Sequence, residues 1–487
     1  MNKSFKHLPQ NERKKILLIC DDIRVHSGVA TVAKEMVINT CQHFNWVQVA
    51  GAIKHPEAGK RFDLSADTNK EAELEDSSVI LYPTDGYGNP DLIRQLIKIE
   101  KPDAIFIITD PRYFTWLFNM ESEIRKVMPI IYLNIWDDYP APLYNKAYYE
   151  SCDALLAISK QTKNINEIVL GDKAEDKVIK YVPHGLNTKY YFPLDKSSKE
   201  VQDIKKQVFG DDEVDFVMFF NSRNIRRKQI PDTMLAFKLF LDSLPKEKAE
   251  KCRFLLHTEI VHEAGTDLGV IDELLFSKDY PNALAFSTNK LPTATLNLLY
   301  NLADVQILLT SNEGWGLTLT EAMLTGTPII ANVTGGMQDQ MRFEYDMDEG
   351  PGVKKGEWIN FDSDFPSNHL GTYKKHGEWA FPVYPTSRSL QGSPQTPYIW
   401  DDRCTAEDAW IRIKEVYNLG HEKRTEAGMK GREWALSDEA GFTSTKMSNK
   451  IIDAVDELFD TWEPREKFEL INTSDDIKKV QTHALIY

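Results

Sequence analysis

The chain has 487 residues, enough for two or three domains at roughly 150 residues per domain. Hydrophobic residues make up 42% and charged residues 27%, close to the averages of globular proteins, which excludes a disordered or fibrous chain. With 58 basic and 74 acidic residues, the net charge of −16 argues against a protein that binds nucleic acid through bulk positive charge, although a local basic site is compatible with it.

The cysteines and the apolar stretches indicate the cellular compartment of the protein. The cysteines at 20, 41, 152, 252 and 404 are odd in number and far apart, which argues against a metal knuckle or a disulfide framework and favours a reducing environment. The longest apolar stretches have about five residues, whereas a membrane-spanning helix needs about 18. The N-terminus is basic, but no apolar segment of a secretory signal follows it. We therefore expect a cytoplasmic protein without a transmembrane segment.

Short apolar runs rich in β-branched residues alternate with helical patterns along the chain. In the first part, apolar positions 29, 32, 33, 36 and 37 predict a helix packed on a sheet. Buried parallel strands are predicted at 16–20, 79–82, 104–109 and 129–135, and again at 216–220, 254–257, 283–286, 305–309 and 328–331. This alternation predicts an α/β protein with two doubly wound, Rossmann-like domains.

A polar, lysine-rich segment between the two sets of strands predicts a hinge near 190–205. We place one domain at 1–195 and the other at 196–445. Residues 341–402 interrupt the second domain, because they are dense in Gly, Pro and aromatic residues and have no helical period. An irregular insert of this length is normally functional or a separate subdomain. Its aromatic residues suit either stacking on an acceptor or a local core. Helical patterns return at 406–418, 422–436 and 446–462.

The first candidate site follows the first predicted strand. Ser27 and Gly28 come directly before a helix, where a glycine lets a diphosphate approach the backbone N–H groups of the positive helix end. A simple chain turn at Gly28 is an equally good interpretation.

The second candidate site follows the first strand of the second set. Four cations crowd residues 223–228, and such a density favours an anionic ligand. We favour Arg223 and Lys228 as the pair that neutralises the charge on a departing diphosphate. The alternative is a solvated helix start before Pro231, with the helix at 232–241.

The third candidate site lies in residues 310–323, between a strand and a helix. Glu313 falls in the loop and Glu321 in the following helix, so that both carboxylates can face one cleft. After Gly316, the N–H groups of Leu317 and Thr318 can face a phosphate. The alternative is a capping box, in which Thr318 and Glu321 only cap the start of the helix.

These motifs resemble the retaining nucleotide-sugar glycosyltransferases of GT-B fold, of the family four type. The hallmark of that family is two glutamates separated by seven residues, seen as Glu313 and Glu321 within EGWGLTLTEAMLTGTPIIA and followed by Gly335-Gly336. The family's Arg and Lys pair is similar to Arg223 and Lys228. The segments YVPHGLN at 181–187 and DALLAIS at 153–159 also resemble family segments.

The resemblance implies a metal-independent hexosyl- or pentosyltransferase that keeps the anomeric configuration and needs no cofactor beyond its nucleotide diphosphate sugar. It implies that Glu321 binds the ribose, that Glu313 binds the transferred sugar, and that Arg223 and Lys228 hold the diphosphate. Gly28 would touch the phosphate from the first domain. The C-terminal segment 446–487 would return to the first domain.

Two departures from the family concern the acceptor side. Ser27-Gly28 stands where the family has two glycines, and Asp137 and Asp138 follow a strand where the family has a histidine. Either aspartate could hydrogen-bond an acceptor or act as a base, or could simply start a helix before Pro140. Asp110, at another strand end, has the same two interpretations.

The acceptor and some other functions stay open. The acceptor could be a saccharide, a lipid-linked sugar, a small metabolite, a protein or a modified DNA base of the kind that viral transferases glycosylate, although the acidic composition weighs against DNA. A GT-B sugar-nucleotide epimerase or a phosphorylase would share the architecture. A non-catalytic nucleotide-sugar sensor is the alternative from another class.

Overall fold

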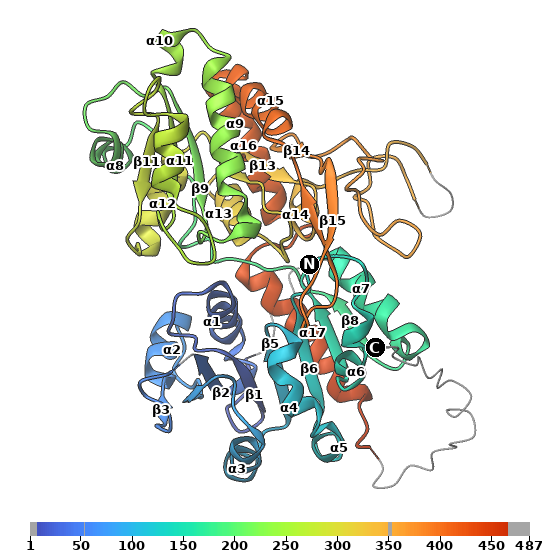
Figure 1. Cartoon of the computed structure of the whole chain (residues 1–487). Coiled ribbons are helices and arrows are strands. Elements are labelled where there is room, and N and C mark those ends of the chain that lie inside the picture. Colours follow the sequence, from blue (N-terminus) through green and yellow to red (C-terminus); the bar gives the residue numbers. More distant parts are fainter. Residues whose placement is uncertain (1–6, 53, 349–352, 466–487) are drawn as a thin grey trace.

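The computed structural model describes residues 7–52, 54–348 and 353–465, which form two α/β lobes (Figure 1). The first lobe holds an eight-stranded sheet. Its strands are β1 (Lys14–Asp21), β2 (Phe44–Ala52), β3 (Phe62–Asp63), β4 (Val79–Asp85), β5 (Ala104–Ile108), β6 (Ile130–Asn134), β7 (Ala154–Ala157) and β8 (Val178–Tyr181). They lie in the order β3-β4-β2-β1-β5-β6-β7-β8, and all neighbours pair in parallel except β3 with β4.

Helices flank this sheet. The central strand β1 is buried because its sequence is apolar. Ile16 to Cys20 are fully buried in β1, as expected of a parallel strand covered on both faces. The helices of the lobe are α1 (Gly28–Thr40), α2 (Ser65–Ala72), α3 (Pro90–Glu100), α4 (Thr115–Phe118), α5 (Glu121–Ile124), α6 (Lys146–Glu150) and α7 (Lys160–Leu170). The predicted apolar stripe of α1 packs inward through Val32, Ala33 and Met36.

The second lobe holds a six-stranded parallel sheet. Its strands are β9 (Phe216–Asn221), β10 (Cys252–His257), β11 (Leu284–Ser287), β12 (Val305–Leu308), β13 (Ile329–Asn332) and β14 (Ala380–Val383), in the order β11-β10-β9-β12-β13-β14. Its helices are α8 (Lys199–Phe209), α9 (Ile230–Asp242), α10 (Lys246–Ala249), α11 (Leu268–Leu275), α12 (Thr293–Leu302), α13 (Leu317–Leu324), α14 (Met337–Met341), α15 (Ala406–Asn418) and α16 (Gly420–Leu436).

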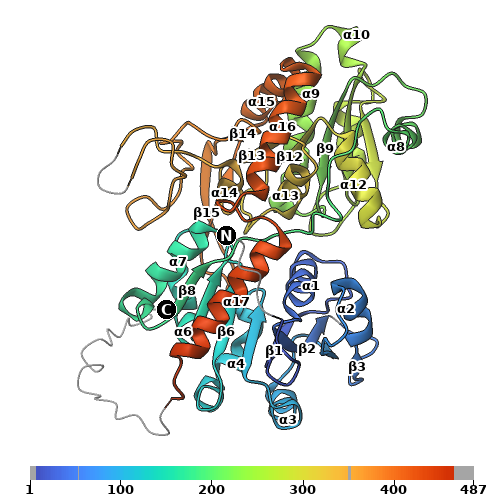
Figure 2. The same ribbon diagram turned by 180° about the vertical axis from the view of Figure 1, so that it is seen from behind.

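The last helix, α17 (Ser444–Thr461), returns to the first lobe, as the resemblance implied. Figure 2 shows it lying across the first sheet near α1. Its Asp456 accepts a hydrogen bond from His43 at 3.0 Å, and its Glu457 pairs with Lys180 at 2.7 Å. The rest of the predicted return segment, 466–487, lies outside the described residues.

The two predicted sheets and all nine predicted strands are confirmed, but several strands were missed. β2 was missed because Asn45 and Gln48 interrupt its apolar run; the buried Gln48 amide donates to Asp21 O at 2.8 Å. The insert 341–402 is irregular only in part. It contributes the edge strand β14 and an antiparallel pair, β15 (Ser387–Gln391) and β16 (Ile399–Arg403).

The lobes are joined by residues 182–198, which form neither a helix nor a strand apart from an isolated bridge of Leu186 with Thr443. The predicted boundary between 195 and 196 falls in this segment and stays a prediction. Within the described ranges, every helix is too short or too polar to cross a membrane.

Candidate active site

The chain order reverses at one central strand of each sheet. β1 lies between β2 and β5, and β9 lies between β10 and β12. Open α/β sheets bind ligands beyond the carboxyl ends of the strands at such points. In the second lobe, these ends lead into the loops 222–229 and 309–316, which hold the basic cluster and Glu313. In the first lobe, they lead toward Ser27 and Asp110.

Glu313 lies against two cations of the basic cluster. Its Oε2 accepts hydrogen bonds from Lys228 Nζ and, at 2.9 Å, from Arg227 Nη1. Burial opposes the ionisation of Glu313, but the charges of Arg227 and Lys228 outweigh it and lower its pKa to about 2. Burial lowers the pKa of Lys228 to about 8, against the attraction of Glu313. The site is therefore a compact ion cluster in which the carboxylate stays charged.

Arg227, rather than Arg223, is the arginine that contacts Glu313. It also donates to Asn312 O at 2.5 Å, so it orders the loop before Glu313. Arg223 is exposed and has no side-chain hydrogen bond or ion pair within the described part of the chain. It lies near enough to Lys228 for its charge to lower the pKa of that amine. The density of cations was the signal for the site, but it could not rank Arg227 above its neighbours.

Glu321 is buried, and its carboxylate is held by phenols. Its Oε1 accepts from the Tyr191 hydroxyl at 3.0 Å, and its Oε2 accepts from the Tyr300 hydroxyl and, at 3.5 Å, from Asn221 Nδ2. Burial raises the pKa of Glu321, although the two phenols act in the opposite direction. Tyr191 and Tyr300 were missed because they lie far from Glu321 in the sequence and belong to no motif.

The start of α13 carries an unsatisfied hydroxyl. The helix begins at Leu317 after Gly316, whose φ of +86° favours glycine, and no side chain caps it. The capping-box interpretation is therefore wrong. Among the residues that the structure describes, Thr318 Oγ1 is buried without a hydrogen-bond partner. The first N–H groups of this helix and the Thr318 hydroxyl together form a site suited to an anion.

The start of α1 lies opposite the start of α13. Ser27 caps α1 by accepting from Ala30 N at 3.0 Å, and its hydroxyl lies 2.5 Å from Asp21 Oδ2. A Cβ added to Gly28 would lie 3.5 Å from Leu317 Cδ1 of the other lobe. The N-termini of two helices thus approach one another between the lobes, and Gly28 leaves room for that approach.

The Gly335-Gly336 pair packs under the Glu313 loop. A Cβ on Gly335, which has φ of +51°, would lie 2.0 Å from Glu313 O and 2.9 Å from Asp137 O. A Cβ on Gly336 would lie 2.1 Å from Gly314 O. Only glycine allows this contact, which joins the Glu313 loop to the first lobe.

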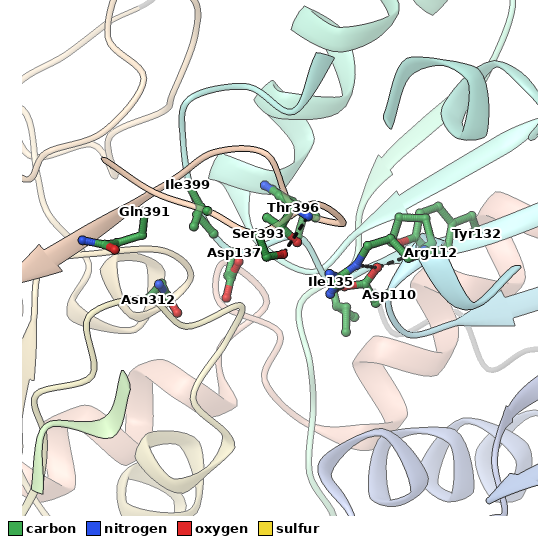
Figure 3. Close-up of a pocket in the computed structure, with 13 residues that line it drawn as sticks. Asp110, Arg112, Tyr132, Ile135, Asp137, Asn312, Gln391, Ser393, Thr396 and Ile399 are labelled. Carbon is green, nitrogen blue, oxygen red and sulfur yellow. Dashed lines mark hydrogen bonds and ion pairs between the residues drawn. The ribbon is translucent and has the colours of Figure 1, made fainter. Parts of the chain in front are cut away.

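A cavity of about 410 Å³ lies beside this cluster (Figure 3). Asp110 and Asp137 line it from the first lobe and Asn312 from the second. Asp110 pairs with Arg112, whose Nε donates at 2.8 Å. Burial raises the pKa of Asp137, and the nearby Arg227 charge opposes that rise.

Asp138 does not line this cavity. Its Oδ1 accepts from Tyr139 N at 2.7 Å, and Thr334 Oγ1 lies 3.3 Å from its Oδ2 and 2.9 Å from Asp402 Oδ2. Burial and the neighbouring Asp402 raise the pKa of Asp138 well above its usual range. Asp138 therefore contacts the second lobe, whereas Asp137 and Asp110 face the open volume.

Comparison with known proteins agrees with this fold. Residues 278–346 match the family described as Glycosyl transferases group 1. The structure aligns with that of sucrose-phosphate synthase from Thermosynechococcus elongatus with a TM-score of 0.62. The two are 14% identical, and the alignment covers 92% of this chain and 100% of that one. For Anabaena HepE in complex with UDP-glucose, the TM-score is 0.58 at 12% identity, covering 91% and 99%. The chain therefore has the GT-B fold and carries a glycosyltransferase group 1 segment, which confirms the resemblance to GT-B glycosyltransferases.

Two curated relatives are similar in sequence. The chain is 32% identical to alpha-monoglucosyldiacylglycerol synthase of Acholeplasma laidlawii over 184 residues, which are 35% of this chain and 42% of that protein. It is 21% identical to an uncharacterized glycosyltransferase of Methanocaldococcus jannaschii over 258 residues, which are 52% of this chain and 58% of that protein. The chain thus spans about half the length of the curated relatives that it matches.

Proposed function

We propose that this protein is a retaining glycosyltransferase that moves a sugar from a nucleotide diphosphate sugar to an acceptor hydroxyl. The observation that carries the proposal is the convergence of Glu313, the buried Lys228, the half-buried Arg227 and an uncapped helix start in one place, opposite the start of α1. Such a place stabilises the negative charge that develops on a departing diphosphate.

The donor roles follow from the polarity of each group. The N–H groups of Leu317 and Thr318 and the cations Lys228 and Arg223 would hold the diphosphate, with Gly28 and Ser27 closing on it from the first lobe. These groups supply the positive charge that a metal ion supplies in other transferases, so we propose that the reaction needs no metal. Arg227 positions Glu313 through its hydrogen bond.

The two glutamates would bind opposite ends of the donor. A carboxylate accepts hydrogen bonds from two vicinal hydroxyls, which makes Glu321 suited to the ribose and Glu313 to the transferred sugar. Tyr191 and Tyr300 keep the Glu321 carboxylate in place until the ribose arrives. Because Glu313 is ionised, it also stabilises positive charge at the anomeric carbon.

UDP-glucose is the donor to test first. HepE was crystallised with UDP-glucose, and the Acholeplasma relative is named as the synthase of a glucosylated lipid. In the proposed reaction, the bond from the anomeric carbon to the diphosphate oxygen breaks, the acceptor oxygen forms the new bond, and the acceptor proton leaves with the nucleotide diphosphate.

Proton NMR of the product tests this proposal. An α-linked sugar transferred from an α-linked donor, with one nucleotide diphosphate released per transfer, is the expected result. A β-linked product would overturn retention. Epimerised donor without transfer, or a strict requirement for inorganic phosphate, would overturn the transferase itself.

A further inference from the structure

The end of the 341–402 insert forms a β-hairpin that reaches from the second lobe to the first. Figure 1 shows β15, the strand in orange, crossing between the two lobes. At its far end, Trp400 N donates to Tyr139 O at 2.8 Å, and the Tyr144 hydroxyl donates to Tyr398 O at 2.9 Å. The tip of the hairpin is therefore attached to the first lobe.

The base of the hairpin is attached to the second lobe next to Glu313. Asp402 N donates to Ser311 O at 3.0 Å, and Asn332 Nδ2 donates to Asp402 O at 2.8 Å. Arg388 on β15 donates to the Asp402 carboxylate. Both ends of the hairpin are thus fixed by hydrogen bonds, and these bonds fix the position of its turn between the lobes.

The turn of the hairpin forms one wall of the 410 Å³ cavity. Gln391, Ser393 and Thr396 line the cavity from the hairpin, together with Asp137 and Asn312, and Ser393 and Thr396 lie near Asp137 (Figure 3). The turn is ordered, since Thr396 N donates to Ser393 Oγ at 3.1 Å. A volume of this size is typical of sites for small molecules.

The chemistry of the lining indicates what the cavity can hold. The hairpin offers one amide and two hydroxyls, and Asn312 adds a second amide. The charged side chains are Asp110, Asp137 and Arg112, so carboxylates outnumber cations. Amides, hydroxyls and carboxylates bind sugar hydroxyls, whereas a phosphorylated acceptor would meet a net negative wall.

We propose that residues 387–403 are an acceptor-recognition element, which binds a neutral saccharide through the side chains of Gln391 and Thr396. This inference rests on the proposed transferase function and adds the class of acceptor and the segment that selects it. The donor-binding lobe thereby contributes to the acceptor site, and a single rigid hairpin places the acceptor beside Glu313.

The test begins with the wild-type protein. A thermal-shift comparison of UDP-, GDP- and ADP-glucose selects the donor, and transfer is then measured to maltose, to glucose 6-phosphate and to diacylglycerol in phosphatidylcholine vesicles. Transfer to maltose in preference to the other two is the expected result. Preference for glucose 6-phosphate or diacylglycerol, or donor hydrolysis without transfer to maltose, would overturn the saccharide assignment.

The hairpin is tested with two near-isosteric variants, Thr396→Val and Gln391→Met. Each removes hydrogen-bonding groups from the wall, so the KM for maltose should rise roughly fivefold to tenfold, while the KM for the donor and the melting temperature stay unchanged. Gln395→Met is the matched control, because Gln395 is exposed on the same turn and does not line the cavity.

The outcomes separate this inference from the proposed function. An unchanged KM for maltose in both variants, or an equal rise in Gln395→Met, would overturn the role of the hairpin while leaving the transferase intact. Failure of the wild-type protein to bind or cleave any of the three donors would instead count against the proposed function.

Discussion

At the scale of single residues, the ion cluster around Glu313 decides what the site can do. The Glu313 carboxylate accepts hydrogen bonds from the buried Lys228 and the half-buried Arg227. Its pKa of about 2 means that it is charged near neutral pH. Removing the carboxylate or a cation leaves a buried charge without its partner, which costs folding free energy. The residues of this cluster should therefore be sensitive to changes that conserve shape but alter charge.

Glu313→Gln should lower kcat about 100-fold to 1,000-fold, because an amide cannot stabilise positive charge at the anomeric carbon. Binding of the nucleotide diphosphate should be retained, as measured by calorimetry alongside donor turnover. Glu273→Gln, at an exposed position of α11, is the control. A kcat within about twofold of wild type would contradict the role of Glu313.

Lys228 should make nucleotide diphosphate binding depend on pH. Burial lowers its pKa to about 8, so the amine is charged below that pH and loses its charge above it. The affinity for UDP should therefore fall as the pH rises through 8.

Calorimetric titrations at several pH values on both sides of 8 measure this dependence. Lys228→Arg is the control, because a guanidinium keeps its charge throughout and should flatten the profile. An affinity for UDP that does not change with pH in the wild-type protein would remove Lys228 from the diphosphate site.

At the scale of elements, the ends of strands and helices bring the site together. The loops after β9 and β12 supply the cations and Glu313, and the starts of α13 and α1 approach each other from the two lobes. The glycine pair before α14 keeps the Glu313 loop in place by a contact that leaves no space for a side chain.

Gly335→Ala should displace the Glu313 loop and destabilise the second lobe. The added methyl would lie 2.0 Å from Glu313 O at a residue with φ of +51°, and strain with overpacking costs about 2–5 kcal/mol. Gly356→Ala is a matched control, since Gly356 has φ of +86° but no atom within 4 Å of the added Cβ.

Denaturant unfolding and donor turnover would be measured for both glycine variants. The control should lose only about 1–2 kcal/mol and keep its activity. Equal losses of stability in the two variants would show that backbone strain, rather than the contact with the Glu313 loop, accounts for the effect.

At the scale of the whole molecule, several contacts besides the 182–198 segment join the lobes. They include the return of α17, the hairpin 387–403, and the contact of α7 with the insert, where Lys160 Nζ donates to Ile359 O at 2.7 Å. The cleft between the lobes is therefore defined by several segments that lie far apart in the sequence.

Ile451→Ala should destabilise the protein through α17. Ile451 is fully buried on the face of α17 that packs on the first lobe, and such a truncation costs about 2–5 kcal/mol. Asp453→Ala, on the exposed face of the same helix, should leave the melting temperature nearly unchanged. If both variants melt at the wild-type temperature, α17 contributes no packing energy to the first lobe.

The sequence alone determined the two-sheet architecture and the loops in which the candidate site lies. Periodicity reveals buried strands and amphipathic helices because each depends on neighbouring residues, and the motifs at Glu313, Lys228 and Gly28 are local as well. The α15 range 406–418 was predicted as the structure has it, because its period and cap are both local.

Only the tertiary structure decided which side chains meet. It selected Arg227 as the arginine that contacts Glu313, placed Tyr191 and Tyr300 on Glu321, separated Asp137 from Asp138, and brought the hairpin of the insert to the cavity. These contacts join residues from different strands, loops and lobes, and no periodic pattern or spacing along the chain encodes a meeting that depends on how two sheets are packed together.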